Sequence, residues 1–214
     1  MTAPSLTLPA TLRPEGRDQA LDYLRSYFAP VDAQTGYTGS RFERLSGGGD
    51  RPSVADEFTA DDLVAVTMLS VTVPARAGLE ILERQRSEIR ELLKQIPTDL
   101  DLASVEGDAI TPEWPAWRLW TRLMEINGLG STTVSKLLAR KRPRLLPVYD
   151  SLVAELLQPR GDFWNALHRT LRVGTPSLQE HLLSLRAESG IGEDISPLRV
   201  FDVVAWRTAK DLLR

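Results

Sequence analysis

The 214-residue sequence contains no cysteine, only two histidines and no long run of apolar residues. Without cysteine, the chain cannot form disulfides, cysteine-ligated zinc, iron–sulfur clusters or a catalytic thiol. His168 and His181 are too far apart in the sequence to match a short metal-ligand motif, so we predict neither a metal site nor a cofactor. No apolar stretch approaches the roughly 18 residues of a membrane span. The N-terminus also lacks the pattern of a signal peptide, so we expect a cytoplasmic protein without a membrane partner.

The rest of the composition is that of an ordinary globular protein, with 42% hydrophobic and 26% charged residues. Its net charge of −3 conceals an asymmetry: residues 1–111 carry 11 basic and 18 acidic side chains, whereas residues 112–214 carry 15 and 11. Within 114–144, seven basic residues accompany a single acid, Glu125. Such a stripe is compatible with an anionic partner, because steering depends on the local field. The alternative is a solvated helix end.

Helical periodicity dominates the pattern of apolar residues. It predicts helices over 18–28 and 75–96, and a capped helix over 59–70. Proline follows threonine or serine at 111–112, 175–176 and 196–197, which is typical of the first turn of a helix. No pattern is visible in the glycine-containing segment 29–56, which predicts a long loop, with a hairpin around 37–45 as a local alternative.

We therefore predict a single all-α domain over 17–214, compact and two-lobed, preceded by a flexible N-terminal arm over 1–16. Trp114, Trp117 and Trp120 recur every three residues within one of its helices. A ladder of this kind can stack nucleic-acid bases, but at helical spacing core packing is the more usual role.

The segment 126–153 carries the functional information. One helix ends near Ile126, Gly128-Leu129-Gly130 turns the chain, and a second helix begins at Ser131, which predicts a helix–hairpin–helix at about 117–140. The free N–H groups at the start of the second helix form a ready phosphate site. A plain turn in which glycine only ends a helix is the alternative. The expected contacts to a nucleic-acid backbone are Gly128, Gly130, Ser131, Thr132, Lys136, Arg140, Lys141 and Arg142.

This segment resembles the helix–hairpin–helix of the base-excision DNA glycosylases, the HhH-GPD superfamily. Asn127-Gly128-Leu129-Gly130 matches the hairpin, with Asn127 in place of the family's proline, and Leu146–Ser151 (LPVYDS) is similar to the link that leads to the family's aspartate. Phe58 and residues 63–70 (LVAVTMLS) resemble the helix before the residue that wedges into DNA. The sequence looks like a bacterial branch of this superfamily. The resemblance implies a glycosylase-like fold, double-stranded DNA as partner and a role in DNA repair.

The resemblance also implies roles for single residues. Asp150 matches the aspartate that stabilises the cationic sugar or activates water, so a base-excision N-glycosylase is implied. Thr132 stands where bifunctional members carry a lysine, so a monofunctional enzyme without lyase activity is expected. Tyr149 and Thr72 are the candidates for lining the base pocket. From the residues alone, a helix N-cap is the more usual role for Asp150. The alternative function is then a non-catalytic helix–hairpin–helix protein, acting as a DNA-binding or a protein-interaction and regulatory module.

Overall fold

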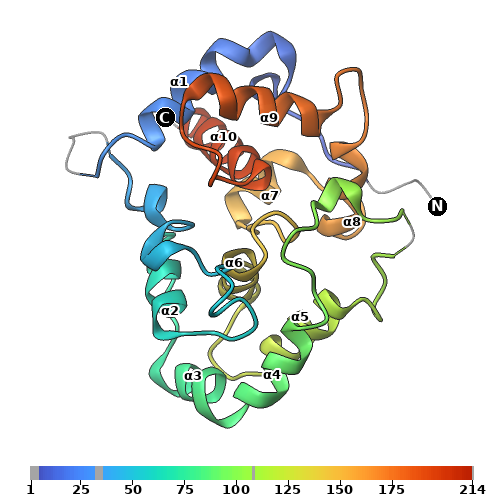
Figure 1. The fold of residues 1–214 in the computed structure, drawn as a ribbon. Helices are drawn as coiled ribbons and strands as arrows, with labels where there is room; N and C mark the ends of the chain where they lie inside the picture. The colour runs from blue at the N-terminus through green and yellow to red at the C-terminus, as the bar shows by residue number, and fades with distance from the viewer. Residues whose placement is uncertain (1–4, 32–35, 108, 214) are drawn as a thin grey trace.

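The computed structural model describes residues 5–31, 36–107 and 109–213. Within these residues the chain forms helices and no strand, with two isolated bridges, Ser5–Arg160 and Gly174–Ser177, which confirms the all-α prediction. The α-helices assigned there are α1 (Arg17–Tyr27), α2 (Ala60–Thr67), α3 (Ala75–Leu79), α4 (Arg86–Leu93), α5 (Pro115–Met124), α6 (Ser131–Lys141), α7 (Ser151–Leu157), α8 (Phe163–Leu171), α9 (Leu178–Ser189) and α10 (Pro197–Leu212) (Figure 1).

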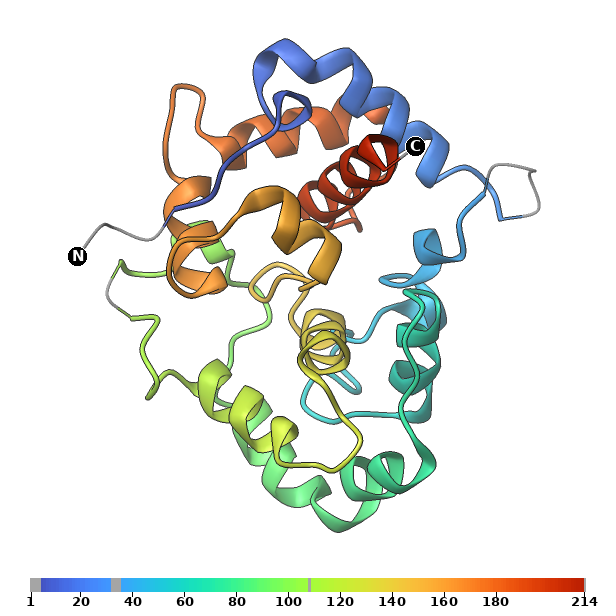
Figure 2. The same ribbon diagram turned by 180° about the vertical axis from the view of Figure 1, so that it is seen from behind.

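The helices form two groups that meet at α6 (Figures 1 and 2). In one group α1 packs against α9 and α10, and α10 also packs against α7, so the first helix lies among the last ones. In the other group α4 packs against α5, while α2 and α5 both pack against α6. Leu137 and Leu138 of α6 are fully buried. The chain therefore leaves the first group after α1 and returns to it after α6.

Several helix boundaries differ from the sequence pattern. The helix expected from Thr175-Pro176 begins at Leu178, because Ser177 caps it, and the helix expected over 59–70 ends at Thr67. The helix expected to begin at Pro112 begins at Pro115, because Trp114 takes the extended N-cap conformation and Pro115 fills the first turn. The helix expected over 75–96 is divided by a π-helical turn at Glu80–Arg84. Apolar periodicity continues through such a turn, so the sequence does not reveal the division.

The expected flexible arm over 1–16 is packed on the body from residue 5 onward. Leu12 is buried, and the hydroxyl groups of Thr11 and Thr208 of α10 lie 2.6 Å apart in a hydrogen bond. The N–H of Thr7 donates to the carbonyl oxygen of Leu157 at 2.8 Å. These contacts with the last helices hold the segment in place, so its order does not depend on an apolar periodicity in its own sequence. Residues 1–4 lie outside the described residues.

The described part of the expected loop 29–56 is built from 3₁₀ turns, at Thr38–Arg41 and Leu45–Gly47, instead of a hairpin. Phe42, between the two turns, is fully buried. This segment packs on the C-terminal end of α6.

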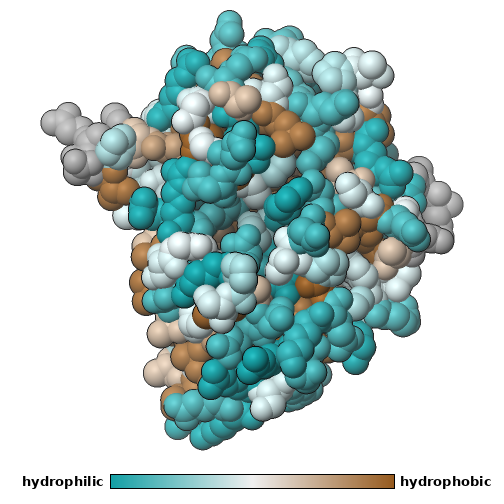
Figure 3. Space-filling model, viewed as in Figure 1, coloured by the Kyte–Doolittle hydropathy of each residue, from teal (hydrophilic) through white to brown (hydrophobic). Residues whose placement is uncertain are grey.

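On the face seen in Figure 3, apolar residues lie in small groups among hydrophilic ones. The large apolar side chains exposed in the described residues are Val31, Val64, Leu79, Met124, Val173, Leu183, Leu212 and Leu213. They come from many different elements. Scattered exposed apolar residues of this kind are normal for a protein surface.

Candidate functional site

Three consecutive cations at the end of α6 are buried: Arg140, Lys141 and Arg142, named here the buried cation cluster. Asp62 of α2, also fully buried, accepts from Arg140 Nε at 3.1 Å through Oδ1, and its Oδ2 lies 2.7 Å from Lys141 Nζ. Arg142 pairs with Asp56 at 2.9 Å. Burial lowers the pKa of Lys141 and of Arg142. With their side chains inside the protein, these three residues are not available to a DNA backbone, contrary to the prediction.

The buried cation cluster instead satisfies main-chain carbonyl groups of the irregular segments around it. Buried carbonyls outside helices and strands need such donors. At Gly49 a Cβ would lie 2.4 Å from the carbonyl oxygen of Arg140, so only glycine allows this approach. The cluster therefore fastens the segment 42–55 and the end of α4 to α6. The accepting carbonyls are those of Phe42, Leu45, Gly49, Val54, Ala55, Leu93 and Ile96, at 2.6–3.0 Å.

The turn 125–130 joins α5 to α6 where the hairpin was predicted, and it is exposed at Gly128 and Gly130. Buried Ile126 and Leu129 anchor the turn. Gly128 has φ +93°, a conformation that favours glycine. At Gly130 a Cβ would meet no atom within 4 Å. The first N–H groups of α6 have no acceptor within the helix, and they begin at this corner. Gly128, Gly130, Ser131 and Thr132 are thus brought together as expected, with Ser131 and Thr132 partly exposed.

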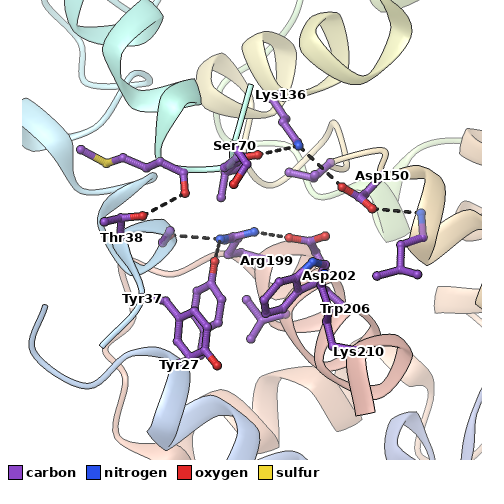
Figure 4. A pocket seen from close by; sticks show the side chains of 16 residues that line it. Tyr27, Tyr37, Thr38, Ser70, Lys136, Asp150, Arg199, Asp202, Trp206 and Lys210 are labelled. Atoms are coloured by element: carbon purple, nitrogen blue, oxygen red, sulfur yellow. Dashed lines mark hydrogen bonds and ion pairs between the residues drawn. The ribbon is translucent and has the colours of Figure 1, made fainter. Parts of the chain in front are cut away.

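A cleft of about 330 Å³ lies between the two helix groups, beside α6 and α10 (Figure 4). One wall is aromatic: the rings of Tyr27 and Tyr37 stack at 5.0 Å, and Trp206 meets both edge to face. The cleft is lined by Tyr27, Tyr37, Thr38, Gly39, Met68, Leu69, Ser70, Lys136, Val148, Asp150, Leu152, Arg199, Asp202, Val203, Trp206 and Lys210.

Asp150 is both a helix cap and a cleft residue. Its Oδ1 accepts from the N–H of Leu152 at 3.0 Å, which caps α7. Its Oδ2 lies 3.7 Å from Lys136 Nζ, and the carboxylate side chain is 25% exposed (Figure 4). The carboxylate is therefore only half used by the cap, and the other oxygen is directed toward the cation in the cleft.

Lys136 reaches the cleft from α6 and is 4% exposed, so it faces the cleft and not the phosphate corner where it was expected. Its ammonium donates to the carbonyl oxygen of Leu69 at 2.8 Å. Burial lowers the pKa of Lys136, while Asp150 opposes that shift. One residue earlier on α6, the hydroxyl of Ser135 accepts from the N–H of Tyr149 at 3.0 Å. Thus α6 positions both the lysine and the link that carries Asp150.

A second ion pair on the cleft wall was missed by the sequence analysis. Arg199 of α10 pairs with Asp202, one turn along, and donates to the Tyr27 hydroxyl at 2.6 Å and to the Gly39 carbonyl at 3.0 Å. Burial raises the pKa of Asp202. A signal existed in the sequence, because both charges interrupt an apolar run of α10 (PLRVFDVVA). The cleft thus combines two carboxylates, two buried cations and an aromatic wall.

Glu43 holds the start of α10, the helix that carries this ion pair. Its carboxylate accepts from the N–H of Ser196 at 3.0 Å and from the Ser196 hydroxyl at 2.7 Å, and Ser196 is the N-cap of α10, as the Ser-Pro pair predicts. Burial raises the pKa of Glu43 to about 7, although the bonds from Ser196 act in the opposite direction.

The titration of Glu43 makes the free energy of unfolding depend on pH. Because its pKa is higher in the folded than in the unfolded chain, its contribution to stability is full below about pH 4.5 and is lost as the pH rises through about 7. We expect Glu43→Gln to remove this dependence, so that the variant gains up to about 3 kcal/mol relative to wild type between pH 5 and pH 8. Urea unfolding at both pH values measures the difference. Equal pH dependence of the two proteins would show that Glu43 does not titrate in this range.

The two pocket candidates do not line the cleft. Thr72 is exposed, and the cleft lining from that segment ends at Ser70, whose φ is +61°. Tyr149 lines a separate pocket of about 190 Å³ together with Trp117, Trp120, Ser131, Phe163 and Trp164, named here the aromatic pocket. The tryptophan ladder pairs with Trp164 of α8, with ring centroids of Trp117 and Trp164 4.4 Å apart.

Both histidines are buried helix residues, and Nε2 of His168 lies 2.9 Å from the carbonyl oxygen of Val105. Among the described residues, no group of three or more histidine, aspartate or glutamate side chains is placed to hold a metal ion. No helix in the same part of the chain is long and apolar enough to cross a membrane.

Fold and site together define a helical protein with an exposed turn between α5 and α6 and a charged, aromatic-walled cleft beside α6 and α10. The chain belongs to the family of unknown function DUF6308, whose model matches residues 20–209. That match spans both sides of the cleft, from Tyr27 to Trp206. A search of curated proteins and a search of solved structures each found no match.

Proposed function

We propose that this protein binds double-stranded DNA at the hairpin and acts on one nucleotide in the cleft as a monofunctional N-glycosylase. The observation that carries the proposal is the position of Asp150, whose Oδ2 faces the cleft beside Lys136 on the same helix that begins at the hairpin. The HhH-GPD resemblance of residues 126–153 supports the same assignment.

The hairpin supplies the docking surface in this proposal. A phosphate accepts from the first N–H groups of α6, next to the positive end of the helix dipole. The hydroxyl groups of Ser131 and Thr132 are partly exposed at the same corner. Gly130 leaves space for the phosphate, since nothing stands within 4 Å of the position of its missing Cβ. Contacts of this kind hold a duplex by its backbone and read no sequence.

The cleft supplies the chemistry. As the C1′–N bond breaks, the sugar acquires oxocarbenium-like charge, which a fixed carboxylate stabilises. Asp150 would provide that charge through Oδ2 and then accept a proton from the water that attacks C1′. The departing base takes up a proton from solvent, and Asp150 afterwards returns its own proton to solvent. Lys136 Nζ lies 3.7 Å from that oxygen and borders the same space. Because Lys136 is buried and bonded to Leu69, it is a positioning residue in this proposal, and no lyase step is expected.

The aromatic wall of the cleft provides a stacking surface for the base. Tyr37 and Trp206 are partly exposed and lie on the cleft lining, where a base removed from the duplex can stack.

A non-catalytic DNA-binding protein of the same fold is the second candidate. It is favoured by the bond from Leu152 to Asp150, because that bond explains the aspartate as an N-cap without catalysis. Burial of Arg140, Lys141 and Arg142 also leaves the hairpin with fewer surface cations than the sequence implies.

The docking surface is tested by Gly130→Asp. Gly130 is the N-cap of α6 with φ −103° and ψ 168°, which any residue adopts, and aspartate is a better N-cap than glycine by a few tenths of a kcal/mol. We therefore expect slightly higher stability but at least tenfold weaker binding of a short duplex, since the new carboxylate occupies the N–H groups and repels phosphate. Fluorescence anisotropy at several salt concentrations measures the affinity, and each lost phosphate contact reduces the salt slope by about 0.9.

Ser177→Asp is the matched control, because it adds the same charge at the N-cap of α9, away from the hairpin. It is expected to bind DNA like wild type. Equal affinities of the Gly130 and Ser177 variants would reject the hairpin as the docking surface, and a wild-type protein that binds no duplex at low salt would reject the proposal.

A further inference from the structure

The aromatic pocket is a second concave site that shares no lining residue with the cleft. It is formed where α5 and α8 meet the start of α6 and the link before α7. Trp117, Trp120, Tyr149 and Phe163 are partly exposed, so their rings are accessible from solvent, whereas Trp164 is buried at the base of the group.

The rings in the pocket contact one another mainly edge to face. Trp120 and Trp164 meet at 5.6 Å with an interplanar angle of 81°, and Tyr149 and Phe163 at 5.4 Å with 76°. In such pairs each ring leaves part of its face uncovered by its partner, and those faces are what a planar ligand stacks on.

The charge and the size of the pocket limit the kinds of ligand that it can bind. Among the residues that the structure describes, no charged side chain lines the pocket, so the part of a ligand inside it is uncharged. Ser131, on its lining, is the first residue of α6, so the positive end of that helix dipole borders the pocket. A volume of about 190 Å³ is below the roughly 300 Å³ at which pockets begin to take drug-sized ligands, so it suits one ring system. A nucleotide combines the two features that the pocket and the helix start favour, which are a neutral ring system and a phosphate.

We infer that the aromatic pocket binds an unpaired nucleobase of the strand whose phosphate contacts the start of α6. This second base site rests on the proposed DNA binding at the hairpin, but it is separate from the cleft and needs no catalysis. The binding is by stacking, which tolerates any base because every base has a π-face.

The test compares two short duplexes that differ at one bulged position, which carries adenine in one and an abasic sugar in the other. Wild type is expected to bind the adenine bulge at least fivefold more tightly. Phe163→Leu keeps apolar volume but removes a ring, and it is expected to abolish the preference while binding the abasic duplex like wild type. Phe163→Tyr, which keeps the ring, is expected to retain the preference. Thermal unfolding of both variants shows that they are folded.

Photo-crosslinking of wild type tests the same inference without a substitution. With 5-iodouracil at the bulge, mass spectrometry is expected to find the crosslink in the peptides that contain Trp117, Trp120 or Phe163.

A crosslink to Tyr37 or Trp206, or a preference that survives Phe163→Leu and is lost in Trp206→Leu, would place the base in the cleft and overturn the inference. Duplex binding without any adenine preference would overturn the inference alone, whereas absence of duplex binding at low salt would reject the proposed function together with it.

Discussion

Asp62→Ala is expected to lower the free energy of unfolding by about 3–5 kcal/mol, because it leaves two buried cations, Arg140 and Lys141, without their counter-charge. The substitution also removes the acceptor for the N–H and hydroxyl of Thr59 at the start of α2. A loss of this size is a large part of the stability of an ordinary domain. Urea unfolding followed by circular dichroism measures it, provided that the variant remains soluble.

The control for Asp62 is a carboxylate with an arginine partner at the surface. Glu80 pairs with Arg84 within one helical turn, and Arg84 is 71% exposed, so Glu80→Gln is expected to leave the free energy of unfolding nearly unchanged. Asp62→Asn keeps one acceptor oxygen but removes the charge, so its loss of stability should lie between those of the other two variants. A loss below 1 kcal/mol for Asp62→Ala would mean that the buried cation cluster does not depend on this acid.

Asp150→Asn is expected to reduce base release by at least about a hundredfold while preserving the cap of α7. Asparagine is as good an N-cap as aspartate, so the bond to Leu152 and the start of α7 are preserved. What is removed is the negative charge beside Lys136, on which the proposed chemistry depends. The measurement is release of free base from duplexes that each carry one damaged or modified base, followed by chromatography.

Two further variants separate capping from catalysis. Asp150→Ala removes the cap as well as the charge, and it is expected to lose about 1 kcal/mol of stability in addition to activity. Asp162→Asn makes the same chemical change at the N-cap of α8, outside the cleft lining, and should keep both activity and stability. If wild type releases no base from any duplex while wild type and Asp150→Asn bind DNA equally, the non-catalytic candidate is supported instead.

Much of the local structure was predictable because it depends on neighbouring residues in the chain. The glycines of the hairpin, the start of α6 at Ser131 and the Ser196-Pro197 cap of α10 follow from backbone preferences that act over a few residues. The same local rule predicts Asp150 equally well as a cap, which its bond to Leu152 shows it to be. Whether its other oxygen faces a cleft is not a local property.

Only the tertiary structure decided which charges are buried and which residues form the cleft. Arg140, Lys141 and Arg142 read as a surface stripe because their partners, Asp62 and carbonyl groups of the segment 42–55, lie far away in the sequence. Tyr27 and Arg199 meet because α1 packs among the last helices. Burial and ion pairing depend on contacts between distant segments, which residue type and periodicity do not encode. The sequence by itself therefore determined the helices and their caps, while packing decided what those helices bring together.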